Sequence, residues 1–194
     1  MFTYILADMK GIEMQSGISV VWRWRVAVLY LVFVYLTLPF ARDIGTYLRS
    51  LEMLRFTTLM IFIVVVFTAM ALNMERLKTM SLGSIISIVV YLILSFSVFF
   101  SIDAPEERLH IVEYSVMAWM FHWALKDTMK EARAYLAAFA ITFFAGCGDE
   151  VIQYFLPDRY YDFRDVLFNA AGASMGILFA WLMVRTGDAA EVEK

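Results

Sequence analysis

The residues best able to carry chemistry form three polar groups in the second half of the sequence. The first contains His110, Glu113 and Tyr114, whose i, i+3, i+4 spacing would place them on one face of a helix. Histidine titrates near neutral pH, so His110 is a candidate for proton transfer or ligand binding. Alternatively, His110 is an interfacial histidine that hydrogen-bonds Tyr114 or a carbonyl group. The alternative for Glu113 is a hydrogen bond that only links two helices.

The second group contains two adjacent carboxylates, Asp149 and Glu150, followed by Gln153. A helix would bring Gln153 next to both carboxylates, because it follows them by four and three residues. Such a pair can serve as general acid and base or as metal ligands. The alternative is that the carboxylates cap and charge a loop that faces water. We predict a catalytic role for both carboxylates together with His110, with Gln153, Glu113 and Tyr114 binding the substrate.

The third group begins with Arg159 and Arg164 and ends with Asp165 and Asn169. Guanidinium groups match phosphate oxygens, so the arginines are candidates for a phosphate site. The alternative is that they pair with aspartates of their own loop. We predict that Arg159, Asp165 and Asn169 contribute to substrate binding, although Asn169 also suits a bridge between helices.

Two glycines, Gly172 and Gly176, continue the helical face that Asp165 and Asn169 begin. At 100° per residue, the four positions fall within about 60° of one another. A small-xxx-small stripe allows a second helix to approach closely, so both glycines are predicted to be structural. Asp165 and Asn169 should therefore point into a bundle, where polar side chains mark a functional site.

The composition of the chain decides which elements position these groups. Its 194 residues are 62% hydrophobic and 18% charged, and the mean hydropathy is +0.70. Soluble domains are about 45–50% apolar, so a water-soluble or disordered chain is excluded. The fold class that remains is an all-α, polytopic transmembrane helix bundle.

Six stretches have the length and apolarity that a bilayer core of roughly 30 Å requires of a helix. The predicted spans are Val20–Phe40, Phe56–Leu72, Leu82–Ile102, His110–Leu125, Ala134–Cys147 and Val166–Val184. The fourth and fifth have short apolar cores, and re-entrant or interfacial segments are the alternative. Full spans are favoured because the polar residues that extend them would face protein rather than lipid.

Lys and Arg are more frequent in the connections that share a side with the N-terminus, which predicts that both termini are cytoplasmic. All three polar groups then lie at outward span ends and suggest a single outward-facing pocket. We divide the chain into an interfacial or dispensable segment (1–19), three N-terminal spans (20–102), a domain with the polar groups (103–184) and a polar tail (185–194).

Other classes of site lack support in the sequence. The net charge is only −3, which does not suggest nucleic acid as a partner. Cys147 is the only cysteine, so an intrachain disulfide is impossible. No cofactor motif is evident, although a divalent metal at the carboxylates stays open. Membrane lipids are the expected surroundings, and the sequence does not indicate an oligomeric state.

The motifs together resemble the VanZ-like family of bacterial membrane proteins over roughly Glu106–Leu178. The pattern is H-x-x-E-Y, then D-E-x-x-Q with a P-x-R turn, then D-x-x-x-N-x-x-G-x-x-x-G, matched at His110, Asp149, Pro157, Asp165 and the residues that follow them. Spans one to three are not covered by this pattern and depart from the shorter arrangement associated with the family. The resemblance implies a place in the bacterial cytoplasmic membrane and a link to low-level teicoplanin resistance.

Two functional hypotheses follow. The favoured one is a binding protein that recognises an envelope lipid headgroup, a lipid-linked precursor or a glycopeptide in the outward pocket. The alternative is a membrane transferase or hydrolase that acts on a lipid-linked phosphate or sugar by acid/base or metal-assisted chemistry. The first is favoured because no complete catalytic set can be named.

Overall fold

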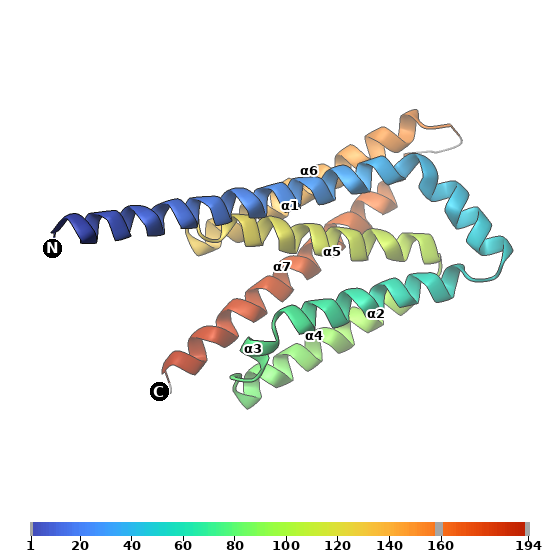
Figure 1. Ribbon diagram of the computed structural model, residues 1–194. Coiled ribbons are helices and arrows are strands. Elements are labelled where there is room, and N and C mark those ends of the chain that lie inside the picture. The colour runs from blue at the N-terminus through green and yellow to red at the C-terminus, as the bar shows by residue number, and fades with distance from the viewer. Residues whose placement is uncertain (1, 158–160, 193–194) are drawn as a thin grey trace.

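The computed structural model is an all-helical bundle, which confirms the predicted fold class (Figure 1). It describes the backbone of residues 2–157 and 161–192 and the side chains of residues 19–157 and 161–185. No strand occurs in these ranges. The helices are α1 (Phe2–Ser50), α2 (Leu54–Leu72), α3 (Met74–Leu77), α4 (Leu82–Ser101), α5 (Pro105–Leu125), α6 (Glu131–Phe155) and α7 (Phe163–Val192).

Among the described residues, five helices are long and apolar enough to cross a membrane, namely α1, α2, α4, α6 and α7. The fourth predicted span, α5, is not among them. Its 21 residues extend about 31 Å, but it contains Glu106, Glu107, Arg108 and Glu113. This helix packs against α1, α2, α6 and α7, so Arg108 is buried and Glu107 and Glu113 are partly buried against protein, while Glu106 near its start is exposed.

Successive long helices run in opposite directions, and the start of α1 and the end of α7 lie at the same end of the bundle (Figure 1). This arrangement fits an even number of crossings with α5 included. The count of six and the cytoplasmic termini stay predictions.

The first helix is longer than the predicted span Val20–Phe40, because it continues to Ser50. Pro39 lies inside it, and the helix changes direction in its last third (Figure 1). Proline removes one backbone hydrogen bond and bends a helix without having to end it. The apolar run therefore ends near the bend, while the helical backbone goes on. The predicted interfacial segment 1–19 and the tail 185–194 fall almost entirely on residues whose side chains lie outside the described set.

The tightest helix pair in the bundle is α5 with α7. A Cβ atom built on Gly172 would lie 2.6 Å from the carbonyl oxygen of Ile111, and one on Gly176 would lie 2.1 Å from that of Ser115. The hydroxyl of Ser115 also donates a 2.9 Å hydrogen bond to the carbonyl oxygen of Gly172. The two backbones thus meet along the glycine stripe, which fixes the register of α7 on α5.

A buried core lies beside this pair, where α1, α5 and α6 meet around Tyr114, Met117 and Phe121. A smaller core joins α2, α4 and α5 through Phe62, Phe99 and Val112, and the rings of Phe62 and Phe99 stack 4.5 Å apart. The outer faces of α1, α2 and α4 carry many exposed large apolar side chains. Such faces suit contact with lipid.

Candidate functional site

Side chains from α5, α6 and α7 meet at the end of the bundle where α6 joins α7. We call this group the polar cluster; its members are His110, Tyr114, Asp149, Glu150, Gln153, Asp165 and Asn169. Asp149 and Glu150 are fully buried, and His110 and Asp165 keep 14% and 19% of their side-chain surface exposed. The cluster therefore has a buried carboxylate floor and a partly open rim.

Both carboxylate oxygens of Asp149 accept hydrogen bonds. The phenol of Tyr114 donates to Oδ2 at 2.9 Å, and the amide of Gln153 donates to Oδ1 at 2.9 Å. The Gln153 bond lies within α6 and follows from the i, i+4 spacing. The Tyr114 bond crosses from α5 to α6, so it couples the position of this carboxylate to the packing of two helices.

Glu150 is bound to the chain segment that leads into α7. Its Oε2 atom accepts a 3.2 Å hydrogen bond from the backbone N–H of Asp162, and its Oε1 atom lies 3.4 Å from the amide nitrogen of Gln153. Glu150 therefore closes the cluster on the side of the α6–α7 connection.

The hydrogen bonds of Asn169 place a proton on Nδ1 of His110. The Asn169 amide group donates to the carbonyl oxygen of Gly146 at 3.3 Å, so its oxygen must face the other way. That oxygen lies 3.0 Å from Nδ1 of His110, which makes Nδ1 the donor. The Nε2 atom is thereby directed to Asp165, whose Oδ2 atom lies 3.9 Å away.

His110 lies between two carboxylates, since its Nδ1 atom is also 3.8 Å from Oδ2 of Asp149. The second oxygen of Asp165, Oδ1, is a buried atom without a hydrogen-bond partner in the described part of the chain. A buried acceptor without a donor costs free energy. Asp165 is thus the member of the cluster with hydrogen-bonding capacity left for a ligand.

The cluster carries more negative than positive charge. Among the side chains that the structure describes, no Lys or Arg lies within ion-pair distance of Asp149 or Glu150. Buried carboxylates are costly without protons or a cation nearby. The arrangement can thus accept hydrogen bonds from hydroxyl or ammonium groups, exchange protons through His110, or hold a cation.

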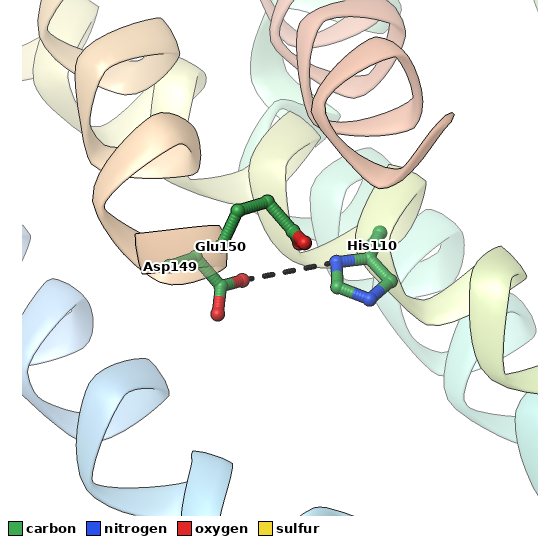
Figure 2. A group of neighbouring side chains, drawn as sticks. All are labelled: His110, Asp149 and Glu150. Atoms are coloured by element: carbon green, nitrogen blue, oxygen red, sulfur yellow. Dashed lines mark ion pairs between the residues drawn. The ribbon is translucent and has the colours of Figure 1, made fainter. Parts of the chain in front are cut away.

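A metal ion would be bound by His110, Asp149 and Glu150. One ligand atom from each lies within 4.8 Å of the others, and Figure 2 shows the two α6 carboxylates directed at the imidazole on α5. Ligands of one divalent ion stand about 2.0–2.2 Å from it when they are N or O atoms of this kind, so the three groups would need to close slightly. The Asn169 hydrogen bond at Nδ1 would also have to be replaced.

Comparison with known proteins identifies the family of this chain. The family model described as VanZ/LLP1 matches residues 20–184. The chain belongs to the VanZ/LLP1 family. The match confirms the resemblance seen in the motifs, and it begins at the first predicted span, so spans one to three fall inside the family as well. Neither the curated proteins nor the solved structures gave a match.

The polar cluster of this VanZ/LLP1 member, as defined above, does not include Glu113, Arg159 or Arg164. Glu113 is half-buried on α5, and its carboxylate has no hydrogen-bond partner among the described side chains; only its backbone carbonyl accepts a bond, from Tyr30. Arg159 lies outside the described residues. The guanidinium of Arg164 lies 3.4 Å from the carboxylate of Glu107 on α5, while the backbone N–H of Arg164 donates a hydrogen bond to Asp162 of its own loop.

Some residues that shape the cluster of this VanZ/LLP1 member were not predicted to do so. A Cβ atom on Gly146 would lie 2.8 Å from the Cβ of Asn169, and one on Gly148 would lie 2.7 Å from the hydroxyl of Tyr35. The hydroxyl of Tyr35 also donates a 2.7 Å bond to the carbonyl oxygen of Ala145. The two glycines that flank Cys147 are the sequence signal, because they indicate close approach on α6.

Proposed function

We propose that the polar cluster binds the headgroup of an envelope lipid, such as a lipid-linked precursor, or of a glycopeptide-type antibiotic. The observation that carries this proposal is a floor of fully buried carboxylates, Asp149 and Glu150, beneath a rim at which His110 and Asp165 remain partly exposed. Polar groups at this depth in a membrane protein mark a functional site.

The charge of the cluster selects among headgroups. Carboxylate and amide oxygens accept hydrogen bonds, so they suit hydroxyl-rich sugars and ammonium groups. A bare phosphate would meet the carboxylates of Asp149, Glu150 and Asp165 and be repelled. The sugar portion of a lipid-linked precursor, or a sugar or amine of a glycopeptide, is therefore the portion that the cluster recognises.

Ligand entry requires a local change at the α6–α7 connection. The N–H of Asp162 covers Glu150, and a ligand hydroxyl or ammonium can take its place as the donor. The unpaired Oδ1 atom of Asp165 supplies a second acceptor at the same rim. The protein then acts without turnover in the bacterial cytoplasmic membrane, with the cluster facing outward, and contributes to low-level teicoplanin-type resistance.

The test combines binding with a resistance phenotype. Native mass spectrometry would use a lipid-linked disaccharide pyrophosphate and teicoplanin as separate probes. Asp149→Asn and Glu150→Gln each remove a buried charge, whereas Asp43→Asn changes an exposed carboxylate of α1 and serves as the control. We expect at least about a tenfold loss of binding of one probe in the cluster variants and none in the control.

The same variants would be expressed in a teicoplanin-susceptible bacterium at matched protein levels. The wild type and Asp43→Asn should raise the inhibitory concentration, and the cluster variants should raise it less. Binding and resistance that are equal in Asp149→Asn, Glu150→Gln and the control would overturn the proposal.

A metal-assisted transferase or hydrolase is the second candidate. It is favoured by one observation, the convergence of ligand atoms from His110, Asp149 and Glu150 within 4.8 Å. The metal would supply Lewis-acid chemistry, while Tyr114 and Gln153 would orient the Asp149 carboxylate beside it. Dialysis against Zn²⁺ or Mn²⁺ followed by elemental analysis tests it. A stoichiometric metal that is lost in His110→Asn and retained in His122→Asn would support this function, and equal metal content in all three proteins would remove it.

A further inference from the structure

A cavity separate from the polar cluster lies at the same end of the bundle, between the α1–α2 turn and the α4–α5 connection. Its volume is about 370 Å³, which falls within the range of small-ligand sites. The lining residues are Arg49, Glu52, Leu54, Arg55, Ala104, Pro105 and Glu106. None of them belongs to the polar cluster, so the cavity is a separate feature.

The charges in this cavity divide into one satisfied pair and two free groups. Arg49 and Glu106 both line the cavity and form an ion pair with each other. Arg55 and Glu52 have no side-chain partner within the described ranges of the chain. The lining residues therefore include one arginine and one glutamate outside the Arg49–Glu106 pair, and the formal charges of the four residues cancel.

The backbone of the α1–α2 turn places Glu52 in an unusual conformation. The N–H of Met53 bonds the carbonyl oxygen of Leu48, and the N–H of Glu52 bonds that of Arg49, which together form a Schellman motif. Glu52 occupies the left-handed position of this motif with φ of 57°. Glycine is favoured at this position, and a glutamate there makes the folded backbone less stable than a glycine would. Glu52 is also one of the residues that line the cavity.

The cavity also lies at the ends of helices that are long enough to cross a bilayer, where lipid headgroups are expected. It is bounded by the end of α1, the start of α2 and the junction of α4 with α5, which are the ends of apolar helices. Large apolar side chains beside it, Leu51, Met53 and Phe56, are exposed. Apolar side chains around charged lining residues match a phospholipid, which joins a charged headgroup to acyl chains at the membrane interface.

We propose that this cavity binds the headgroup of a zwitterionic phospholipid, with the phosphate on Arg55 and the ammonium on Glu52. Guanidinium groups donate to phosphate oxygens, and a carboxylate accepts from an ammonium group. A purely anionic lipid could still place its phosphate on Arg55, but it has no ammonium group for Glu52, whose carboxylate would repel the phosphate. The site is independent of the polar cluster and of the function proposed for it.

The experiment is native mass spectrometry of the full chain purified with an equal mixture of phosphatidylethanolamine and phosphatidylglycerol. The wild type should retain phosphatidylethanolamine in preference. Arg55→Gln should lower retention of both lipids about tenfold, because one charge-assisted contact is lost. Glu52→Gln should abolish the preference while phosphatidylglycerol stays bound. Arg42→Gln, an exposed arginine of α1 that does not line the cavity, should behave as the wild type.

The outcomes separate the sources of the ligand. Soluble phosphoethanolamine should displace the lipid only at far higher concentration, since it lacks acyl chains; displacement at equal concentration would overturn the proposal of a lipid. A preference for phosphatidylethanolamine that is unchanged in Arg55→Gln and Glu52→Gln would overturn the site. If Arg55→Gln fails to fold, Arg55→Lys keeps the charge and should keep the preference. Variants of Asp149 should leave this preference intact, so the two proposals can fail separately.

Discussion

The phenol of Tyr114 on α5 donates a 2.9 Å hydrogen bond to Oδ2 of Asp149 on α6, and both side chains are fully buried. This bond satisfies one of the two oxygens of a carboxylate that has no arginine or lysine beside it among the described residues. Tyr114 is therefore a positioning residue for the floor of the polar cluster. It also joins the helix pair on which the cluster depends.

Replacement of Tyr114 by Phe should destabilise the protein by about 1–3 kcal/mol, because Asp149 would keep a buried oxygen without its donor. Thermal unfolding in detergent measures the effect. Tyr47→Phe is the matched control, since Tyr47 is 65% exposed on α1. Equal unfolding temperatures for the two variants would show that the bond contributes nothing.

The glycine stripe on α7 gives a second prediction. Gly176→Ala would place a Cβ atom 2.1 Å from the carbonyl oxygen of Ser115, whereas Gly45→Ala would meet nothing within 4 Å. The first change should cost about 1–3 kcal/mol as the helices separate. The second should be neutral or stabilising by up to about 1 kcal/mol, because alanine favours helix.

Unfolding midpoints of the two alanine variants test this contrast directly. Gly176→Ala should also loosen the α5–α7 pair, which hydrogen exchange along α5 would record as faster exchange. A Gly176→Ala protein as stable as the wild type would mean that α5 and α7 are farther apart than the structure places them.

Helical spacing explains how much of the site the sequence could predict. The i, i+4 spacing of Asp149 and Gln153 predicts that their side chains are neighbours, and the structure has a 2.9 Å hydrogen bond between them. This contact could be predicted because it depends only on the local geometry of α6. The face shared by Asn169, Gly172 and Gly176 likewise follows from helix periodicity. Such relationships are set within one helix and need no knowledge of its neighbours.

Contacts between distant helices could not be predicted in the same way. Tyr35 reaches Ala145 only because α1 packs on α6 in one particular register. The choice of Asn169, and not Asp165, as the hydrogen-bond partner of His110 depends on how α7 is rotated against α5. Several rotations would satisfy the apolar pattern equally, so side-chain packing decides among them. The extension of α1 beyond Phe40 was missed because an apolar run does not define the end of a helix.

A third prediction concerns the imidazole of His110. Because Asn169 presents its oxygen, neutral His110 should carry its proton on Nδ1. Nitrogen-15 spectra of histidine-labelled protein can read this, and His122, the second histidine of the chain, is identified by its own substitution. Asn169→Leu should remove the preference, whereas Asn73→Leu at the end of α2 should not. Wild-type His110 protonated on Nε2 alone would contradict the assignment.

The α1–α2 turn supports the last prediction, which concerns stability alone. Glu52 has φ of 57°, a left-handed conformation that costs an ordinary residue about 1 kcal/mol and glycine almost nothing. Glu52→Gly should therefore raise the free energy of unfolding by up to about 1 kcal/mol.

Glu52→Ala separates this effect from the loss of charge, because alanine removes the carboxylate but keeps the Cβ atom that makes the conformation costly. Its unfolding midpoint should stay near that of the wild type while that of Glu52→Gly rises. If both variants shift equally, the charge and not the backbone governs the turn. A rise confined to glycine would mean that the chain keeps a glutamate where glycine is more stable, as a residue retained for binding at the cavity would require.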